Sequence, residues 1–324
     1  MTVSVACSRL LHETACFHPL YGDRLANHLP MALIALDRMG ATPDRMEEFA
    51  NRYARRLVRR NIDKHLLDPA TSLGVRNNFE GVLAYFEHRI SELGAASVLR
   101  QWIPSLLPGV AASAFHALIR LAYGIDASDN SEIATGLAYW VIEYQPLGEL
   151  CTTTREATLA EIAAEAGSAV AGHKFVPGII IDRMVEVAAL PAFQRVSVQP
   201  TSLSYEQIAD FAIGMYGARE DFIFLHLVTA CHAFRTLLSY LEGSPDVDRY
   251  LWQAVLVGYL STGLSCEPLS TVRDEKARTW DDCLAAAIES DDDHVIKLVF
   301  TAWQESLRTA DPRYLYVARR KLFG

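Results

Sequence analysis

The sequence lacks the short motifs that mark most common enzyme classes. It contains no Gly-x-Gly triplet, GxxxxGK[ST] loop, GxSxG elbow or HExxH segment, which argues against nucleotide-binding, α/β-hydrolase and zinc-protease sites. His12 and Glu13 begin a zinc-protease pattern, but Cys16 stands where its second histidine belongs. The Glu-x-x-His pairs of di-iron helical bundles are also absent. Any catalytic chemistry must therefore be built in another way.

Positive charge and paired cysteines are also scarce. Thirty Lys and Arg residues oppose thirty-nine Asp and Glu residues, so the net charge is −9, the wrong sign for a nucleic-acid partner. The six cysteines form no CxxC pair and are too sparse for a disulfide framework in 324 residues. We therefore expect a protein of a reducing compartment that does not bind nucleic acid.

Long apolar runs are missing as well. The two most apolar stretches, 222–234 and 251–264, are too short or too polar to cross a bilayer. The N-terminus has no basic region, and Arg9 and His12 interrupt its short apolar start. The sequence therefore predicts a soluble, cytoplasmic protein with no signal peptide and no membrane partner.

Helical periodicity dominates what is present. Hydrophobic residues make up 51% of the chain and charged residues 21%, which is a globular composition. Gly40 is placed to end a helix over 25–39, and Thr42-Pro43-Asp44 is a start signal for a helix over 43–60. Further helices are expected at 77–93, 110–123, 131–143, 153–171, 178–188, 203–215, 219–241, 248–262, 275–289, 293–308 and 312–322. We predict one all-α domain over residues 1–324, a bundle of about a dozen helices.

Four histidines stand in apolar helical surroundings. They are His28, His116, His226 and His294, each on a different predicted helix. A buried imidazole needs a partner for each ring nitrogen, which suggests that the four meet, and converging neutral imidazoles form a metal site. The alternative is that each is a core residue bonded to a backbone carbonyl, and the spacing along the chain does not decide between the two.

Lys297 and an acidic triplet flank the last of these histidines. Lys297 follows His294 by three residues, on the same helix face and among apolar neighbours. Burial would lower its pKa and leave a neutral amine that acts as a base, forms a Schiff base or reacts with carbon dioxide to a carbamate; alternatively, its ammonium reaches water. The triplet 291–293 is expected to cap the helix, and the alternative is a carboxylate that orients His294.

The chain resembles the questin oxidase-like family in four ordered segments. These are Asn27-His28 with Met39-Gly40-Ala41, Phe115-His116-Ala117-Leu118-Ile119-Arg120 with Tyr123-Gly124, Leu225-His226-Leu227-Val228-Thr229, and Asp293-His294-Val295-Ile296-Lys297-Leu298. The resemblance extends from about residue 20 to about residue 305. It implies an all-helical oxygenase that opens anthraquinone-type rings with dioxygen. It further implies a mononuclear non-haem Fe(II) held by His28, His116, His226 and His294, with Lys297 as the carboxylated ligand and a catalytic residue.

The residues and the resemblance thus select the same site. We predict a metal-dependent, cytoplasmic oxidoreductase, an oxygenase that inserts oxygen into an aromatic polyketide or quinone, or cleaves its ring. Its partners would be a small aromatic substrate and dioxygen, with an external reductant because no nucleotide motif is present. Six aromatic residues are possible pocket walls or core residues: Trp102, Phe115, Tyr123, Tyr139, Trp140 and Phe224. Two alternatives remain, a zinc-dependent hydrolase on the same ligands and a non-enzymatic helical scaffold. The sequence does not determine the oligomeric state.

Overall fold

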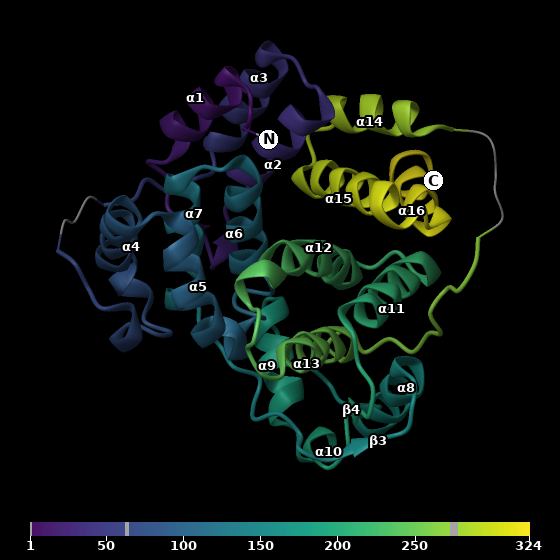
Figure 1. The fold of residues 1–324 in the computed structure, drawn as a ribbon. Coiled ribbons are helices and arrows are strands. Elements are labelled where there is room, and N and C mark those ends of the chain that lie inside the picture. Colours follow the sequence, from purple (N-terminus) through teal and green to yellow (C-terminus); the bar gives the residue numbers. More distant parts are fainter. Residues whose placement is uncertain (1, 62–64, 273–277) are drawn as a thin grey trace.

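The computed structural model describes residues 2–61, 65–272 and 278–324, and these ranges are mainly helical (Figure 1). They contain sixteen α-helices: α1 (Val5–Thr14), α2 (Leu29–Met39), α3 (Pro43–Ala54), α4 (Phe79–Leu93), α5 (Ala95–Leu106), α6 (His116–Ala127), α7 (Asn130–Ile142), α8 (Leu159–Val170), α9 (Ile180–Ala189), α10 (Pro191–Gln194), α11 (Tyr205–Ala218), α12 (Phe222–Leu237), α13 (Val247–Leu260), α14 (Trp280–Glu289), α15 (Asp293–Thr309) and α16 (Pro312–Phe323). The predicted all-α class is confirmed.

Extended structure in the described ranges is limited to short pairs. Strands β1 (Leu20–Tyr21) and β2 (Leu25–Ala26) pair antiparallel, while β3 (Thr154–Arg155) and β4 (Gln199–Pro200) pair parallel. Four 3₁₀ turns complete the described elements: η1 (Pro69–Thr71), η2 (Arg76–Asn78), η3 (Leu107–Gly109) and η4 (Leu238–Tyr240). The β1–β2 hairpin replaces the first turn of the helix predicted at 25–39.

Helix termini follow the local start and stop signals. The Thr42 side chain accepts a hydrogen bond from the Arg45 amide at the start of α3, and Gly40 ends α2 with a left-handed backbone. Both signals were read from the sequence, and both are confirmed. The α3 helix is nevertheless shorter than predicted, because it ends at Ala54 rather than near residue 60.

Several predicted boundaries are wrong. The helix expected at 110–123 begins only at His116, and the one expected at 153–171 begins at Leu159. Helices α1, α5 and α10 were not predicted, and α5 continues through Pro104, where a turn was expected. The helix predicted at 275–289 starts on residues that lie outside the described ranges, and its described part is α14.

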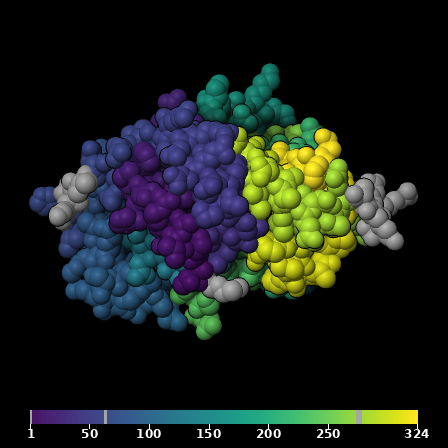
Figure 2. Space-filling model, turned by 90° about the horizontal axis from the view of Figure 1, so that it is seen from above, coloured from purple at the N-terminus to yellow at the C-terminus, as the bar shows by residue number. Residues whose placement is uncertain are grey.

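The four helices that follow or carry the histidines form a closed circuit. Helix α2 packs against α6, α6 against α12, α12 against α15, and α15 against α2. Segments from opposite ends of the chain therefore lie side by side, as the purple and yellow surfaces of Figure 2 show. Residue 28 directly precedes α2 and residue 294 lies in the neighbouring helix α15. The site is therefore formed by residues far apart in the sequence, and no short sequence motif contains it.

Two glycines allow α6 and α7 to pack closely. A Cβ atom on Gly136 of α7 would lie 2.6 Å from Leu121 Cα in α6, and one on Gly124 of α6 would lie 2.9 Å from the Ile133 nitrogen in α7. Neither helix could approach the other in this way with a side chain at these positions. The contact places the start of α6 deep inside the bundle.

A strained turn leads into α6. Ser113, Ala114 and Phe115 are consecutive L-residues with left-handed backbones, at φ values of 50°, 53° and 69°. Each such residue costs about 1–2 kcal/mol, and strain of this kind gathers at functional sites because the surrounding structure must stabilise it. The turn directs the Ser113 carbonyl at the His116 ring.

One helical stretch in the described ranges, 222–240, is long and apolar enough to cross a membrane. It is the continuation of α12 into η4, and it lies within the bundle with 67% of its apolar window buried. Burial of this extent is what a core helix shows, so the stretch is no evidence of a membrane span. The cytoplasmic location remains a prediction.

Candidate metal centre

The structure brings the four predicted histidines together. His28 immediately precedes α2, His116 opens α6, His226 lies in the second turn of α12, and His294 is the second residue of α15. Consecutive rings around the helix circuit have centroids 4.7 Å (His28–His116), 4.8 Å (His116–His226), 5.4 Å (His226–His294) and 4.7 Å (His294–His28) apart. The four rings therefore form a closed group. Their convergence, which the spacing along the chain did not decide, is a feature of this structure.

The Nδ1 atom of each ring faces an oxygen. His116 Nδ1 donates to the Ser113 carbonyl, and His226 Nδ1 donates to the Phe222 carbonyl at 2.7 Å. His28 Nδ1 donates to the Asp293 carboxylate, whose same oxygen lies 3.5 Å from His294 Nδ1. A carbonyl or carboxylate oxygen only accepts, so the hydrogen bonds of His28, His116 and His226 favour the tautomer with its proton on Nδ1.

The Nε2 atoms of His28, His116 and His226 are consequently left with free lone pairs. His116 Nε2 and His226 Nε2 are 3.2 Å apart, and neither carries a proton when both Nδ1 atoms donate. The Nε2 atoms of His28 and His294 are buried with no hydrogen-bond partner in the described structure. Two facing lone pairs and two unsatisfied buried acceptors are costly, and a cation bound among them would remove that cost.

Burial keeps His28, His116 and His226 neutral. The pKa values of His28, His116 and His226 lie well below the usual range of histidine, chiefly because burial penalises the charged ring. Neighbouring positive groups contribute to each depression; one of them is Lys297. Neutral imidazoles are the form that binds a metal ion, so the set is ready to act as ligands near pH 7.

Lys297 follows His294 by three residues in α15 and does not reach water. It is 2% exposed, and no carboxylate of the described residues lies within ion-pair distance of its ammonium. Burial lowers its pKa to about 8, against the opposing effect of Asp293 and Asp292. The alternative of an ammonium that reaches solvent is therefore wrong, whereas the carbamate remains a prediction.

The acidic triplet has both of the roles that were weighed for it. Asp292 caps α15 by accepting from the amides of His294 and Val295. Asp293, the first helical residue, is buried and bonded to His28. Burial raises the pKa of the Asp293 carboxyl, but the opposing effect of His28 is larger, so the net pKa lies below the usual range of aspartate. Sequence reasoning connected this triplet only with His294 and missed the bond to His28, because residues 28 and 293 are joined only by the fold.

The histidines open onto a cavity of about 590 Å³. Its apolar wall comes from the start of α9, where Ile179, Ile180 and Ile181 face it, and from Phe222 and Ile223 at the start of α12. The Phe222 ring lies 4.7 Å from the centroids of both His226 and His294. An aromatic wall therefore exists, although not the one considered from the sequence. The i, i+4 spacing of Phe222 and His226 was the available signal.

The six aromatic residues considered from the sequence do not line this cavity. Phe115, Tyr123, Tyr139, Trp140 and Phe224 are buried in the core, and Trp102 packs against it. Their packing role, the favoured interpretation, is confirmed.

The donor set fits a divalent transition metal. Four imidazole nitrogens suit iron, zinc, copper and nickel, whereas magnesium and calcium prefer oxygen. The candidate ligand atoms of His28, His116 and His294 lie within 4.8 Å of one another, and His226 joins them through His116. Each Nδ1 faces an oxygen acceptor in the way that ligating histidines usually do.

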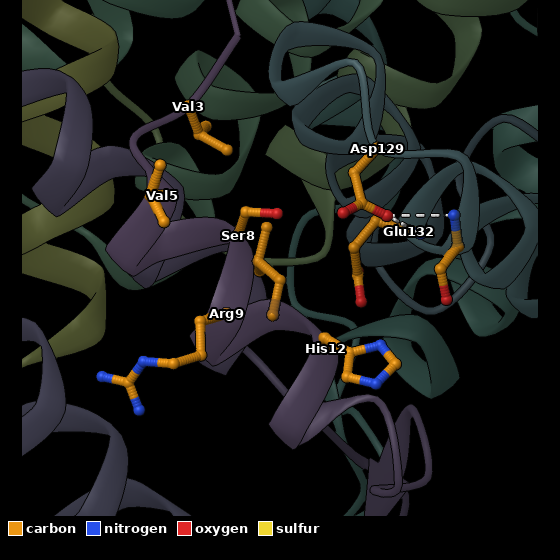
Figure 3. A pocket seen from close by; sticks show the side chains of 9 residues that line it. Val3, Val5, Ser8, Arg9, His12, Asp129 and Glu132 are labelled. Atoms are coloured by element: carbon orange, nitrogen blue, oxygen red, sulfur yellow. Dashed lines mark hydrogen bonds between the residues drawn. The ribbon is translucent and has the colours of Figure 1, made fainter.

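A second cavity, of about 580 Å³, lies between α1 and the start of α7 (Figure 3). Its two carboxylates are already engaged: Asp129 caps α7, and Glu132 forms a buried ion pair with Arg120 at 3.0 Å. His12 lines it alone among histidines. This cavity therefore offers no comparable group of free donor atoms.

Known proteins are similar to this chain over most of its length. Residues 25–302 match the questin oxidase-like family. A Baeyer-Villiger oxidase of Pestalotiopsis microspora is 24% identical over 332 residues, which cover 84% of this chain and 74% of that protein. Another, from Paecilomyces divaricatus, is 28% identical over 151 residues, 40% of this chain and 32% of that protein.

These relatives do not support the two alternatives of a zinc-dependent hydrolase and a non-enzymatic scaffold. The match extends over all four histidines and Lys297. The chain belongs to the questin oxidase-like family and is an oxidoreductase.

Proposed function

We propose that this protein is an oxygenase that depends on a mononuclear non-haem iron and acts on an aromatic polyketide or quinone. The observation that carries the proposal is the convergence of four histidine rings, in which two Nε2 atoms lie 3.2 Å apart and two others are buried without a partner. The family membership and the two Baeyer-Villiger oxidases supply the reaction class. The nitrogen donors alone also suit zinc, and the family and its relatives favour an oxygenase over zinc-dependent hydrolysis.

His28, His116, His226 and His294 would hold the ion, and a carbamate on Lys297 would add an anionic oxygen ligand. Ferrous iron bound there supplies the electron-transfer chemistry that dioxygen needs to react with a closed-shell organic molecule. Asp293 and the carbonyls of Ser113 and Phe222 keep the rings in the ligating tautomer. The protein therefore contributes a preorganised, neutral nitrogen set.

The cavity beside these nitrogens fits a flat aromatic molecule. Phe222 offers a ring face next to His226 and His294, and Ile179, Ile180 and Ile181 keep that part of the cavity apolar. A substrate held there would present a ring carbonyl to the histidine group.

The overall reaction balances with one external reductant. Insertion of one atom of dioxygen beside a ring carbonyl breaks a carbon–carbon bond and forms an ester or lactone. The second oxygen atom leaves as water, which takes up two electrons and two protons from the reductant. No nucleotide motif is present in the sequence to hold that reductant, so we propose that it is either supplied from solution or carried by a hydroquinone form of the substrate.

The test uses protein loaded with Fe(II) and bicarbonate under argon and then given oxygen-18 gas with a panel of hydroxyanthraquinones and ascorbate. Mass spectrometry should find a product with one labelled oxygen atom. His226→Ala should abolish it, and exposed His88→Ala should leave the rate unchanged. Circular dichroism establishes that both variants are folded.

Unlabelled product, or equal turnover by wild type and folded His226→Ala, would contradict the proposal. Turnover supported by zinc without consumption of oxygen would replace the oxygenase with hydrolysis.

A further inference from the structure

Three arginines line the cavity beside the histidines: Arg24, Arg56 and Arg183. A guanidinium without a carboxylate partner favours an anionic ligand, because a charge that is partly shielded from water and unpaired is costly. Their partners therefore indicate which of them is available to a ligand.

Two of the three are already engaged with carboxylates. Arg24 forms a bidentate pair with Asp182 at 2.9 and 2.6 Å. Arg56 lies 3.7 Å from the Asp293 carboxylate and stacks on the Tyr53 ring at 3.6 Å. The other carboxylate lining the cavity, Asp221, accepts the first amides of α12. These charges are compensated within the protein.

Arg183 is not compensated in this way. Among the described residues, no hydrogen bond or ion pair joins its guanidinium to another group, and its Nε atom is buried without a partner. It belongs to the first turn of α9, next to Ile179, Ile180 and Ile181 in the apolar wall of the cavity. A cation at this position is suited to an anionic group on a molecule whose remainder is apolar.

Backbone dipoles favour the same sign of ligand. The starts of α2, α6, α9, α12 and α15 all contribute residues to this cavity, and the N-terminal end of a helix carries partial positive charge. The N-cap residues of α2 and α6, His28 and Phe115, provide no side-chain cap. The potential from the backbone therefore adds to the charge of Arg183.

We propose that Arg183 is a specificity-determining residue that binds an anionic oxygen substituent, a carboxylate or an ionised phenol, on the aromatic substrate. This inference rests on the proposed function for the identity of the aromatic molecule. The anion is held by the α9 wall, and the ring extends from there towards Phe222 and the histidines. Neutral aromatic molecules of the same shape bind more weakly, because they leave the buried Nε atom of Arg183 without a charged partner.

The test measures affinity and needs no turnover. Isothermal titration calorimetry compares 2-naphthoate with 2-naphthamide, which share a fused ring and differ in charge, on the full-length protein. Wild type should bind 2-naphthoate at least about ten-fold more tightly, a preference typical of hydrogen bonds to a charged group. Arg183→Gln should reduce the ratio to about one, and Arg183→Lys should retain part of it. The matched control is Arg195→Gln, which removes the same charge from an exposed position directly after α10 and should keep the wild-type ratio.

Chelator-treated wild type distinguishes Arg183 from the histidine group as the anion site. A preference that survives chelation but not Arg183→Gln supports the proposal, even if the protein proves to have no metal or oxygenase activity. Equal binding of both probes by wild type, or an unchanged preference in folded Arg183→Gln, would overturn it. So would a preference that disappears on chelation, because the anion would then be held by a metal ion.

Discussion

Replacement of Lys297 by methionine should stabilise the metal-free protein. The side chain is 2% exposed, and burial lowers its pKa from 10.5 to about 8. A pKa difference of one corresponds to about 1.4 kcal/mol, so ionised Lys297 costs roughly 3 kcal/mol of folding free energy at pH 7. Methionine has a similar length and no charge, so Lys297→Met removes most of this cost.

The pH dependence has a defined sign. The unfolded chain binds the lysine proton up to about pH 10.5, whereas the folded protein releases it near pH 8. Wild type should therefore gain stability as the pH rises from about 8 to about 10.5. The advantage of Lys297→Met should be largest below pH 8 and should shrink across that interval.

Urea denaturation of metal-free, carbonate-free protein between pH 7 and pH 10.5 measures both effects. The control is Lys174→Met at an exposed position, which should change stability by less than about 0.5 kcal/mol. The same Lys297→Met protein should lose oxygenase activity, since it cannot form a carbamate. A variant that is less stable than wild type at pH 7, or a difference that does not change with pH, would refute the reasoning.

Substitutions at three further positions test other parts of the account, each by urea denaturation. Ala114→Gly should leave stability unchanged or raise it by up to about 1 kcal/mol, because φ is 53° there. Ala114→Val should cost about 2 kcal/mol or more. Equal effects of the two substitutions would contradict a strained backbone at residue 114. Burial raises the pKa of Glu305, but His232 and Arg235 lower it more, so the net pKa is about 2. Glu305→Gln should therefore cost about 3 kcal/mol of folding free energy at pH 7 and progressively less from pH 4.5 towards pH 2. A cost that does not change with pH, or an equal loss in exposed Glu87→Gln, would contradict this. Gly136→Ala should cost about 1–3 kcal/mol because its Cβ would meet Leu121 Cα at 2.6 Å. Gly167→Ala, whose nearest contact is 3.9 Å, should be neutral or stabilising. Equal losses of stability in the two variants would contradict the close packing of α6 against α7.

Local signals in the sequence predicted the helices better than their ends. Gly40 and Thr42 mark α2 and α3 correctly because each acts on its own neighbouring amides and carbonyls. The turn at 113–115 was missed because an alanine and a phenylalanine adopt left-handed backbones only when tertiary packing imposes them. Periodicity cannot register such an override.

In the candidate site, too, local signals could be predicted from the sequence and tertiary contacts could not. All four histidines and Lys297 could be selected from the residues, because imidazoles and a lysine in apolar helical segments are unusual, and the resemblance selected the same set. The bond of Asp293 to His28 and the unpaired Arg183 were beyond reach, because each depends on which residues surround a side chain from other helices. In the sequence, Asp293 looks like an ordinary helix-capping residue, and Arg183 looks like an ordinary solvated arginine.

The most direct test of the central claim is the metal content of protein purified anaerobically without affinity metals and loaded with Fe(II) and bicarbonate. Elemental analysis should find about one iron per chain in wild type and in His88→Ala, and a loss of iron in folded His226→Ala and His294→Ala. Failure of wild type to retain stoichiometric iron, or full retention by both folded site variants, would contradict the four-histidine centre.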